Sequence, residues 1–361
     1  MNVLGIDTSC DDTAVAIVAG GRIVLSSVIS SQTGLHAATG GVVPEVASRR
    51  HLDDICPALM RALDEAGLGL KKIDAVAATV GPGLAGSLMV GYNLARSLAW
   101  ASDKPFIAVN HLEGHIYSAW LAEDDAPPPP PAFPVLILIV SGGHTELVMM
   151  AGHGRYGRLG GTRDDAAGEA FDKVGRLLGL PYPGGPAIQA AAERALGRGA
   201  IALPRAWLRG NDDFSFSGLK TAVLHLTQAH ADEQPDRTEA GSIAPAIEQT
   251  APGAANADGW VNAVAAGFQD SVADVLATKT AAAARRQRVA SVVLCGGVAA
   301  NSAIKARLRA ALPDGLPLYV PRPAFCTDNG AMIAAAAYYR LDTAVDPAHS
   351  PDVSPGLALP L

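Results

Sequence analysis

His111 and His115 stand four positions apart in the stretch HLEGHIYSAW (residues 111–120), with Glu113 between them. Residues four apart share one face of a helix, so both imidazoles could reach a single metal ion. Glu113, two positions from His111, would point away from that ion. The stretch therefore differs from the H-E-x-x-H pattern of zinc proteases, in which the glutamate faces the metal as a base.

Asp328 is the candidate for a third ligand, in the stretch FCTDNGAMIAAAAYY (residues 325–339), where it directly precedes a predicted helix. Two neutral imidazoles and one carboxylate, with open coordination positions, form a recognised catalytic metal set. His111 also follows the predicted strand KPFIAVN, and ligand sites tend to lie at strand ends. A simpler interpretation stays open, because histidine pairs of this spacing are common by chance and aspartate is a preferred helix N-cap.

Three short polar or glycine-bearing turns each follow a predicted buried strand. They are DTSCDDT (residues 7–13), SGGHTE (141–146) and CGGVAAN (295–301). Successive backbone N–H groups in such turns form binding sites for anions. In any one turn the glycines are explained by tight turning alone. Three turns of this kind together favour the binding of a phosphate or a nucleotide.

The elements predicted around these turns form an α/β pattern. Residues 2–31 predict three strands, and helices then alternate with strands as far as residue 110. The segment PVLILIVSGGHTELVMM (residues 134–150) repeats the strand, turn and strand of the N-terminus. This repetition predicts two related lobes, each presenting a hairpin turn to a shared cleft.

We expect an N-terminal lobe over residues 1–110, to which residues 330–361 return, and a C-terminal lobe over residues 111–329. Two segments of biased composition interrupt the second lobe. The proline-rich residues 122–134 predict a stiff spacer. Residues 229–258, rich in Ala, Pro, Glu and Asp, predict a flexible insertion.

The composition indicates the cellular compartment of the protein and limits its binding of nucleic acids. With 28 Lys+Arg against 35 Asp+Glu, the formal net charge of −7 would not attract a polyanion, so a nucleic acid would need local basic patches or partner chains. Four scattered cysteines and an N-terminus without a basic leader predict a cytoplasmic protein with free thiols. The apolar run VLILIV is far shorter than the roughly 20 residues of a membrane span.

Nine stretches, in order from the N-terminus to about residue 340, resemble the bacterial TsaD family of tRNA threonylcarbamoyltransferases. They are GIDTSCDDTAVAIV, GGVVPEVASRRH, GPGLAGSLMVG, NHLEGHIYSAW, LIVSGGHTEL, DDAAGEAFDKVGRLLGLPYPGGP, FSFSGLKTAV, CGGVAANSAIK and FCTDNGAMIA. The resemblance implies the two-lobed fold of actin, sugar kinases and Hsp70, with a nucleotide cleft between the lobes. It lapses only in the two segments of biased composition.

The implied activity is transfer of a threonylcarbamoyl group from threonylcarbamoyl-adenylate to the exocyclic amine of the adenosine 3′ to the anticodon, in tRNAs reading codons that begin with adenine. The resemblance makes His111, His115 and Asp328 ligands of one divalent metal, with Fe²⁺ expected and Zn²⁺ the alternative. Asp11 matches an acidic position linked to activity. The positions assigned to donor binding are Ile139, Val140, Ser141, Gly142, Gly143, Asp172, Gly185 and Asn301.

The resemblance also implies two protein partners, an inactive paralogue of the TsaB type that pairs with the N-terminal lobe and a small P-loop ATPase of the TsaE type. Three alternatives stay open at this point. Asp172 could form a surface ion pair with Arg176 instead of binding ribose. The protein could be a metalloprotease, although the spacing of Glu113 argues against that, or a small-molecule kinase or carbamoyltransferase of the same fold.

Overall fold

The computed structural model describes residues 1–37, 39, 41–123, 128–195, 199–232 and 255–360. Its N-terminal sheet has the strand order β3-β2-β1-β4-β5. The first three strands pair antiparallel, and β4 and β5 add parallel to β1. The strands are β1 (Asn2–Asp7), β2 (Asp12–Ala19), β3 (Ile23–Ser31), β4 (Ala75–Gly81) and β5 (Phe106–Asn110).

The second sheet repeats this topology. Its order is β10-β9-β6-β7-β8, with β6, β7 and β8 antiparallel and β9 and β10 added parallel to β6. The strands are β6 (Val135–Val140), β7 (Thr145–Gly152), β8 (Arg155–Gly161), β9 (Ser291–Cys295) and β10 (Leu318–Tyr319). The α/β fold and the repetition predicted from the two strand–turn–strand segments are therefore confirmed.

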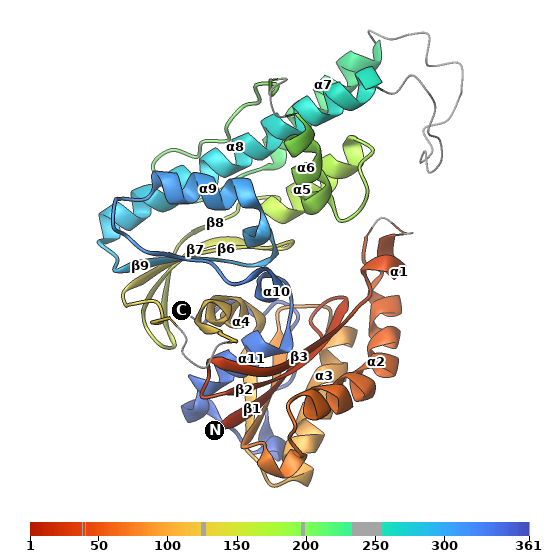
Figure 1. Ribbon diagram of the computed structural model, residues 1–361, viewed down its shortest axis with the longest axis vertical. Coiled ribbons are helices and arrows are strands. Elements are labelled where there is room, and N and C mark those ends of the chain that lie inside the picture. The colour runs from red at the N-terminus through yellow and green to blue at the C-terminus, as the bar shows by residue number, and fades with distance from the viewer. Residues whose placement is uncertain (38, 40, 124–127, 196–198, 233–254, 361) are drawn as a thin grey trace.

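Helices form three layers around the two sheets (Figure 1). Alternate residues of β1 point to opposite faces, so that Leu4 and Ile6 join the core under α2 (Pro44–Glu65) and α3 (Ala85–Ala101). Val3 joins a central core that also contains residues of β6, α4 (His111–Tyr117) and α11 (Gly330–Tyr338). The helices α4 and α11 therefore lie between the sheets.

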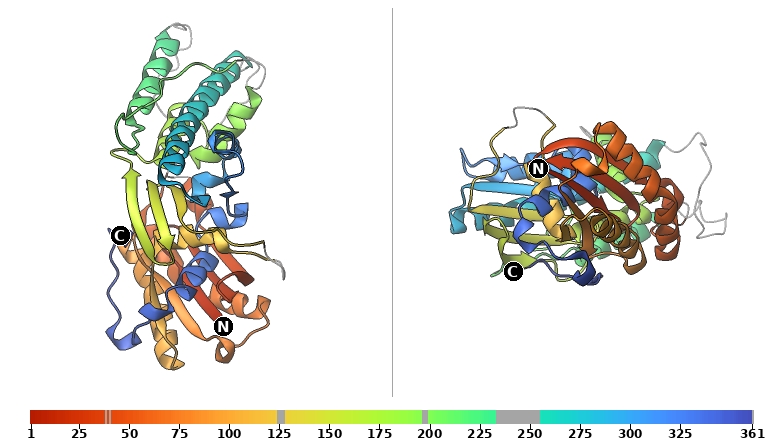
Figure 2. Two further views of the ribbon diagram at one scale, coloured as in Figure 1. Left: turned by 90° about the vertical axis from the view of Figure 1, so that its left-hand side faces the viewer. Right: turned by 90° about the horizontal axis from the view of Figure 1, so that it is seen from below.

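The outer face of the second sheet carries the remaining long helices. Leu136, Leu138 and Val140 of β6 point into a second hydrophobic core, the outer core, which lies between the sheet and these helices. The helices are α5 (Ala167–Leu177), α6 (Gly184–Arg194), α7 (Ser217–Asp232), α8 (Ala255–Gln287) and α9 (Ser302–Ala311). Figure 2 shows α7 and α8 at the end of the molecule farthest from the N-terminus. The short helices are α1 (Thr33–Ala37), α10 (Pro323–Cys326), η1 (Leu70–Lys72), η2 (Ser118–Trp120), η4 (Gly297–Ala300), η5 (Leu341–Thr343) and η6 (Pro347–His349).

Close backbone contact brings α11 onto the first sheet. A Cβ on Gly5 of β1 would lie 2.3 Å from the carbonyl oxygen of Gly330, so only glycine permits this approach. After α11 the chain stays with the first sheet, because the Val345 N–H donates to the Phe106 carbonyl (3.0 Å) and the Ser354 N–H to the Val80 carbonyl (2.7 Å). The lobe boundaries at residues 110 and 330 stay predictions.

The two segments of biased composition behave differently. Most of residues 229–258 lies outside the described residues. At its edges, however, the flexible interpretation is wrong, because residues 229–232 continue α7 and residues 255–258 begin α8. Stacking of the His230 and Trp260 rings, with centroids 4.1 Å apart, joins these helices.

In the predicted spacer, Ala122 pairs with the β2–β3 turn, since its N–H donates to the Arg22 carbonyl (2.8 Å). Residues 124–127 of that segment lie outside the described residues. None of the helices in the described part of the chain combines the length and the hydropathy that a membrane crossing requires.

Candidate functional site

The end of β5 determines where the two histidines lie. Asn110 is the N-cap of α4, and its Oδ1 accepts hydrogen bonds from the Leu112 N–H (2.9 Å) and the Glu113 N–H (3.4 Å). His111 is therefore the first residue of the helix, and His115 lies one turn later on the same face. Gly114 faces α11, where a Cβ would lie 2.8 Å from Cδ1 of Ile333. The histidine helix is thus packed closely in the central layer.

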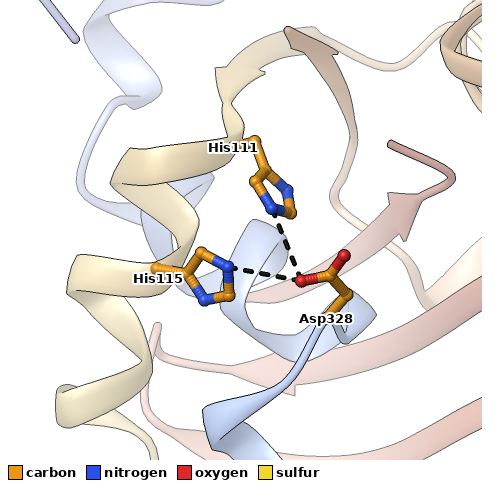
Figure 3. Close-up of side chains that lie close together, drawn as sticks. All are labelled: His111, His115 and Asp328. Atoms are coloured by element: carbon orange, nitrogen blue, oxygen red, sulfur yellow. Dashed lines mark ion pairs between the residues drawn. The ribbon is translucent and has the colours of Figure 1, made fainter. Parts of the chain in front are cut away.

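His111, His115 and Asp328 converge on one point (Figure 3). Oδ1 of Asp328 lies 3.5 Å from Nε2 of His111 and 3.3 Å from Nε2 of His115. One ligand atom from each residue lies within 4.8 Å of the other two, so the group could hold a metal ion. The alternative that Asp328 is a helix N-cap is wrong, because Asn329 caps α11 by accepting from the Met332 N–H (2.8 Å). Asp328 is left with its carboxylate toward the imidazoles.

Burial and charge oppose each other in this group. Burial alone would raise the pKa of Asp328, but His111 and His115 hold that pKa well below its usual range. Burial would lower the pKa of His111, but the carboxylates of Asp328 and Asp7 raise it well above its usual value. A divalent cation would balance the same carboxylates, and it would compete with protons for the imidazoles. The donor set therefore fits a metal.

Glu113 points away from this group, as its spacing predicted. Both of its carboxylate oxygens accept from Nη1 of Arg340 at 2.7 Å, and Oε1 also accepts from the Tyr156 hydroxyl (2.9 Å). Its side chain is 3% exposed. Glu113 is thus the buried partner of an ion pair between α4 and the chain after α11. It cannot reach a water on the opposite side of the helix, which removes the base that a metalloprotease would need.

Two adjoining cavities lie at the site, and the metal candidates line one of them. A polar cavity of about 420 Å³ is lined by both hairpin turns, among them Asp11, Ser141 and His144, together with His111, His115 and Asp328. A more apolar cavity of about 440 Å³ is lined by α5 and α6, including Phe171, Asp172 and Gly185, and by Asn301. Gly142, Gly297 and Thr327 line both cavities. The boundary between the two cavities is therefore formed in part by the turn after β6, at Gly142, and by the turn after β9, at Gly297.

The structure brings most of the residues assigned to donor binding to these cavities. Ser141, Gly142 and Gly143 line the polar one, and Gly142, Asp172, Gly185 and Asn301 line the apolar one. Ile139 and Val140 line neither cavity. Both side chains are fully buried in β6, one in the central core and the other in the outer core. Their side chains therefore pack the sheet that carries the turn.

Asp172 and Asn301 also have structural tasks. Oδ1 of Asp172 accepts from the Gly184 N–H (2.8 Å) at the start of α6, and burial raises the pKa of this carboxyl. Among the described contacts, Asp172 forms no ion pair with Arg176. Asn301 caps α9, and its Nδ2 donates to Oε1 of Gln269 (2.8 Å). Each side chain thus fixes the start of a helix, and the first turn of α6 and the cap of α9 border the apolar cavity.

Sequence reasoning missed three side chains at the site. Asp7, the first residue of the turn DTSCDDT, lies with Oδ2 3.4 Å from Nδ1 of His111. His144 lines the polar cavity. His51 of α2 holds the first turn, with Nε2 3.0 Å from the Cys10 carbonyl and Nδ1 2.7 Å from the Thr13 hydroxyl. Asp7 and His144 stand inside turns that the sequence singled out, whereas His51 had no local signal.

Comparison with known proteins assigns the family. Residues 23–335 match the family described as "TsaD: tRNA N6-adenosine threonylcarbamoyltransferase". A Thermomicrobium roseum protein of that name is 55% identical over 345 residues, which are 94% of this chain and 92% of the relative. A Bacillus subtilis protein of that name is 46% identical, over 99% of this chain and 96% of the relative. This chain belongs to the TsaD family.

Membership confirms the resemblance and the activity that it implied. The protein is a tRNA N6-adenosine threonylcarbamoyltransferase by family. Solved structures support the fold alone. HypF from T. kodakarensis has a TM-score of 0.58 at 15% identity, covering 95% of this chain and 48% of HypF. A Clostridium difficile activator of 2-hydroxyisocaproyl-CoA dehydratase with bound ADPNP has a TM-score of 0.50 at 15% identity, and the match covers 98% of this chain and 100% of the activator.

Proposed function

We propose that the two cavities form one active site for threonylcarbamoyl-adenylate. The nucleotide occupies the apolar cavity, and the threonylcarbamoyl group reaches into the polar cavity beside His111, His115 and Asp328. The observation that carries this proposal is that Gly142 lines both cavities. The phosphate of the donor connects its two halves, and a glycine turn with exposed backbone N–H groups is suited to an anion at that junction.

The second turn is open enough to receive the phosphate. A Cβ on Gly142 or Gly143 would meet no described atom within 4 Å, so the space next to the backbone is free. Asp172 uses Oδ1 for the Gly184 N–H, which leaves Oδ2 for a ribose hydroxyl. Phe171 supplies an apolar wall for the base. Positioning of this kind accounts for a large part of the catalysis of a group transfer.

In the transfer, the N6 amine of adenosine attacks the carbamoyl carbon of the donor. The new C–N bond replaces the bond from that carbon to the phosphate oxygen, AMP leaves, and the amine gives up one proton to solvent. Asp11 lines the polar cavity with the metal candidates and is the acidic group that we assign to the amine, where its carboxylate accepts a hydrogen bond.

His111, His115 and Asp328 would hold one divalent ion, for which Fe²⁺ and Zn²⁺ both suit the ligand set. Such an ion would orient the donor and polarise the carbonyl under attack. The convergence of the three ligand atoms and the unusual pKa values of His111 and Asp328 support this assignment.

We also propose that α2 carries the docking surface for the inactive paralogue. Leu52 and Met60 are 64% and 59% exposed, and Cys56 between them is exposed as well. Their spacing of four places them in one stripe along the helix. Leu52→Asp should prevent association in size-exclusion chromatography, whereas Trp100→Asp, at a similarly exposed site on α3, should not. We expect the P-loop ATPase to be a second protein partner. We also expect the protein to act in the cytoplasm.

The experiment that tests the proposed function supplies synthetic threonylcarbamoyl-adenylate and unmodified tRNA to the full chain with its paralogue. Mass spectrometry of the digested tRNA should show threonylcarbamoyladenosine 3′ to the anticodon. Depletion of the protein in cells should remove that nucleoside. Asp172→Asn should weaken use of the adenylate, and transfer at an undiminished rate by that variant would contradict our placement of the nucleotide.

A further inference from the structure

The two ring nitrogens of His111 face two different carboxylates. Nε2 lies 3.5 Å from Oδ1 of Asp328, and Nδ1 lies 3.4 Å from Oδ2 of Asp7. Asp7 ends β1 and is fully buried, so it has no water to solvate its charge. Its position behind the ring, away from the metal candidates, calls for an explanation that the ligand set itself does not provide.

Three hydrogen bonds hold the Asp7 carboxylate in place. The Thr79 hydroxyl donates to Oδ1 at 2.7 Å, and the Ser9 N–H donates to the same oxygen at 3.3 Å. The Ser9 hydroxyl donates to Oδ2 at 3.3 Å. These hydrogen bonds orient the carboxylate with Oδ2 toward His111. Nδ1 of His111 is buried and forms no other hydrogen bond among the described residues, and the Asp7 carboxylate oxygen 3.4 Å away faces it.

We propose that Asp7 is a positioning residue that selects the tautomer of His111. By accepting the Nδ1 proton it leaves Nε2 as the atom that would donate its electron pair to a metal ion shared with Asp328. Metal-bound histidines commonly donate their other ring N–H to a carboxylate, which orients the ring and raises the basicity of the ligand. The inference rests on the proposed metal role of His111, and it adds Asp7, Ser9 and Thr79 as the groups that prepare this ligand.

Asp7→Asn separates this role from a structural one. The amide oxygen can still accept from Ser9 and Thr79, so the turn after β1 is kept. The amide NH₂ then faces Nδ1 of His111 and donates to it, which favours a proton on Nε2 and blocks the ligand atom. A comparable carboxylate-to-amide change behind a catalytic histidine leaves the geometry intact but imposes the wrong tautomer.

The test is a titration of the full chain with Zn²⁺ alone, followed by calorimetry. Asp7→Asn should bind Zn²⁺ about 10-fold to 100-fold more weakly than the unmodified chain. Nitrogen-15 NMR of the metal-free protein should show a proton on Nδ1 of His111 in the unmodified chain and none on Nδ1 in the variant. Asp53→Asn, at an exposed position on α2, controls for the loss of one negative charge and should leave the affinity unchanged.

Thermal unfolding of the metal-free variant should match that of the unmodified chain. If Asp7→Asn does not fold, Thr79→Val, which removes one of the donors that hold the carboxylate, should lower the Zn²⁺ affinity several-fold. Equal Zn²⁺ affinity of the unmodified chain and the folded Asp7 variant would overturn the inference alone. Absence of stoichiometric Zn²⁺ binding by the unmodified chain would instead overturn the proposed metal role on which it rests.

Discussion

The turn between β1 and β2 and the turn between β6 and β7 occupy the same place in two sheets of the same topology, yet their chemistry is opposite. The first contains Cys10 and Asp11 and is flanked by Asp7 at the end of β1 and Asp12 at the start of β2. The second, from Ser141 to His144, contains two glycines and no acidic residue. Both line the polar cavity. One topology thus presents an acidic turn and a glycine turn to the same space.

The difference explains how one site can bind a cation and an anion at the same time. Acidic groups near the histidines favour a cation and a proton acceptor, whereas the glycine turn favours an anion. A donor that carries a phosphate at one end and a reacting carbonyl at the other matches this separation. The comparison predicts that changes beside the first turn affect metal and transfer, and that changes at the second turn affect the nucleotide.

The largest expected effect comes from His111→Ala, beside the first turn. With one imidazole removed, only His115 and Asp328 remain, and two protein ligands rarely hold a divalent ion at a catalytic site. Single-turnover transfer should fall by about two to three orders of magnitude, the usual cost of one strong electrostatic contact. Elemental analysis should show loss of metal, and binding of AMP should persist.

His349→Ala is the control for this change, since His349 is exposed at the C-terminal end of η6. It should keep both metal and activity. Full activity of His111→Ala without bound metal would show that the histidine pair is structural and would remove the chemical contrast between the turns.

A second change tests whether the glycine turn depends on its packing. A Cβ on Gly168 of α5 would lie 2.4 Å from the carbonyl oxygen of Ser141. Gly168→Ala should therefore lower the free energy of unfolding in urea by about 1–3 kcal/mol, as overpacking does. Gly218→Ala, at a position of α7 where a Cβ would meet nothing within 4 Å, should not destabilise the protein. Unchanged stability of Gly168→Ala would mean that the turn can move.

Gly142→Val should act on the nucleotide without affecting the fold. Because a Cβ at Gly142 would meet no described atom within 4 Å, the side chain fills only the space that we assign to the phosphate. We expect the dissociation constant for AMP to rise about tenfold, which corresponds to about 1.4 kcal/mol. Gly157→Val, on exposed β8, is the matched control. Equal AMP affinity in both variants would place the phosphate elsewhere.

The smallest expected effect is a difference in pH dependence between the turns. Burial raises the pKa of Asp12, directly after the first turn, to about 7. Burial, followed by the charges of His111 and His115, lowers the pKa of His144 in the second turn to about 4. Between about pH 4 and 7 the folded state holds the extra proton on Asp12, so this residue lowers stability as the pH rises. Below about pH 6.5 the unfolded state binds the extra proton on His144, so this residue lowers stability as the pH falls.

Urea unfolding at a series of pH values measures both effects in the metal-free protein. Asp12→Asn should reduce the loss of stability toward pH 7, and His144→Asn should reduce the loss toward pH 4. If both substitutions change the pH profile in the same direction, the two turns do not differ in charge as the structure indicates.

Local sequence determined the parts of the site that depend on short-range rules. The i, i+4 spacing placed His111 and His115 on one helix face, and Asn110 directly before them is a residue that starts helices. The same spacing rule turned Glu113 away from the ligands. The repeated strand–turn–strand pattern predicted two related lobes, because alternation and turn residues are local properties of the chain.

Tertiary structure decided which distant groups meet. Asp328 follows His111 by more than two hundred residues, and only the packing of α11 against α4 brings them together. A local rule could not choose between Asp328 and Asn329 as the helix cap, since both types are suited to it. Asp7 faces His111 because β1 and β5 both pair with β4 and end at the same edge of one sheet. Such contacts depend on strand order and helix packing, which no short stretch of sequence specifies.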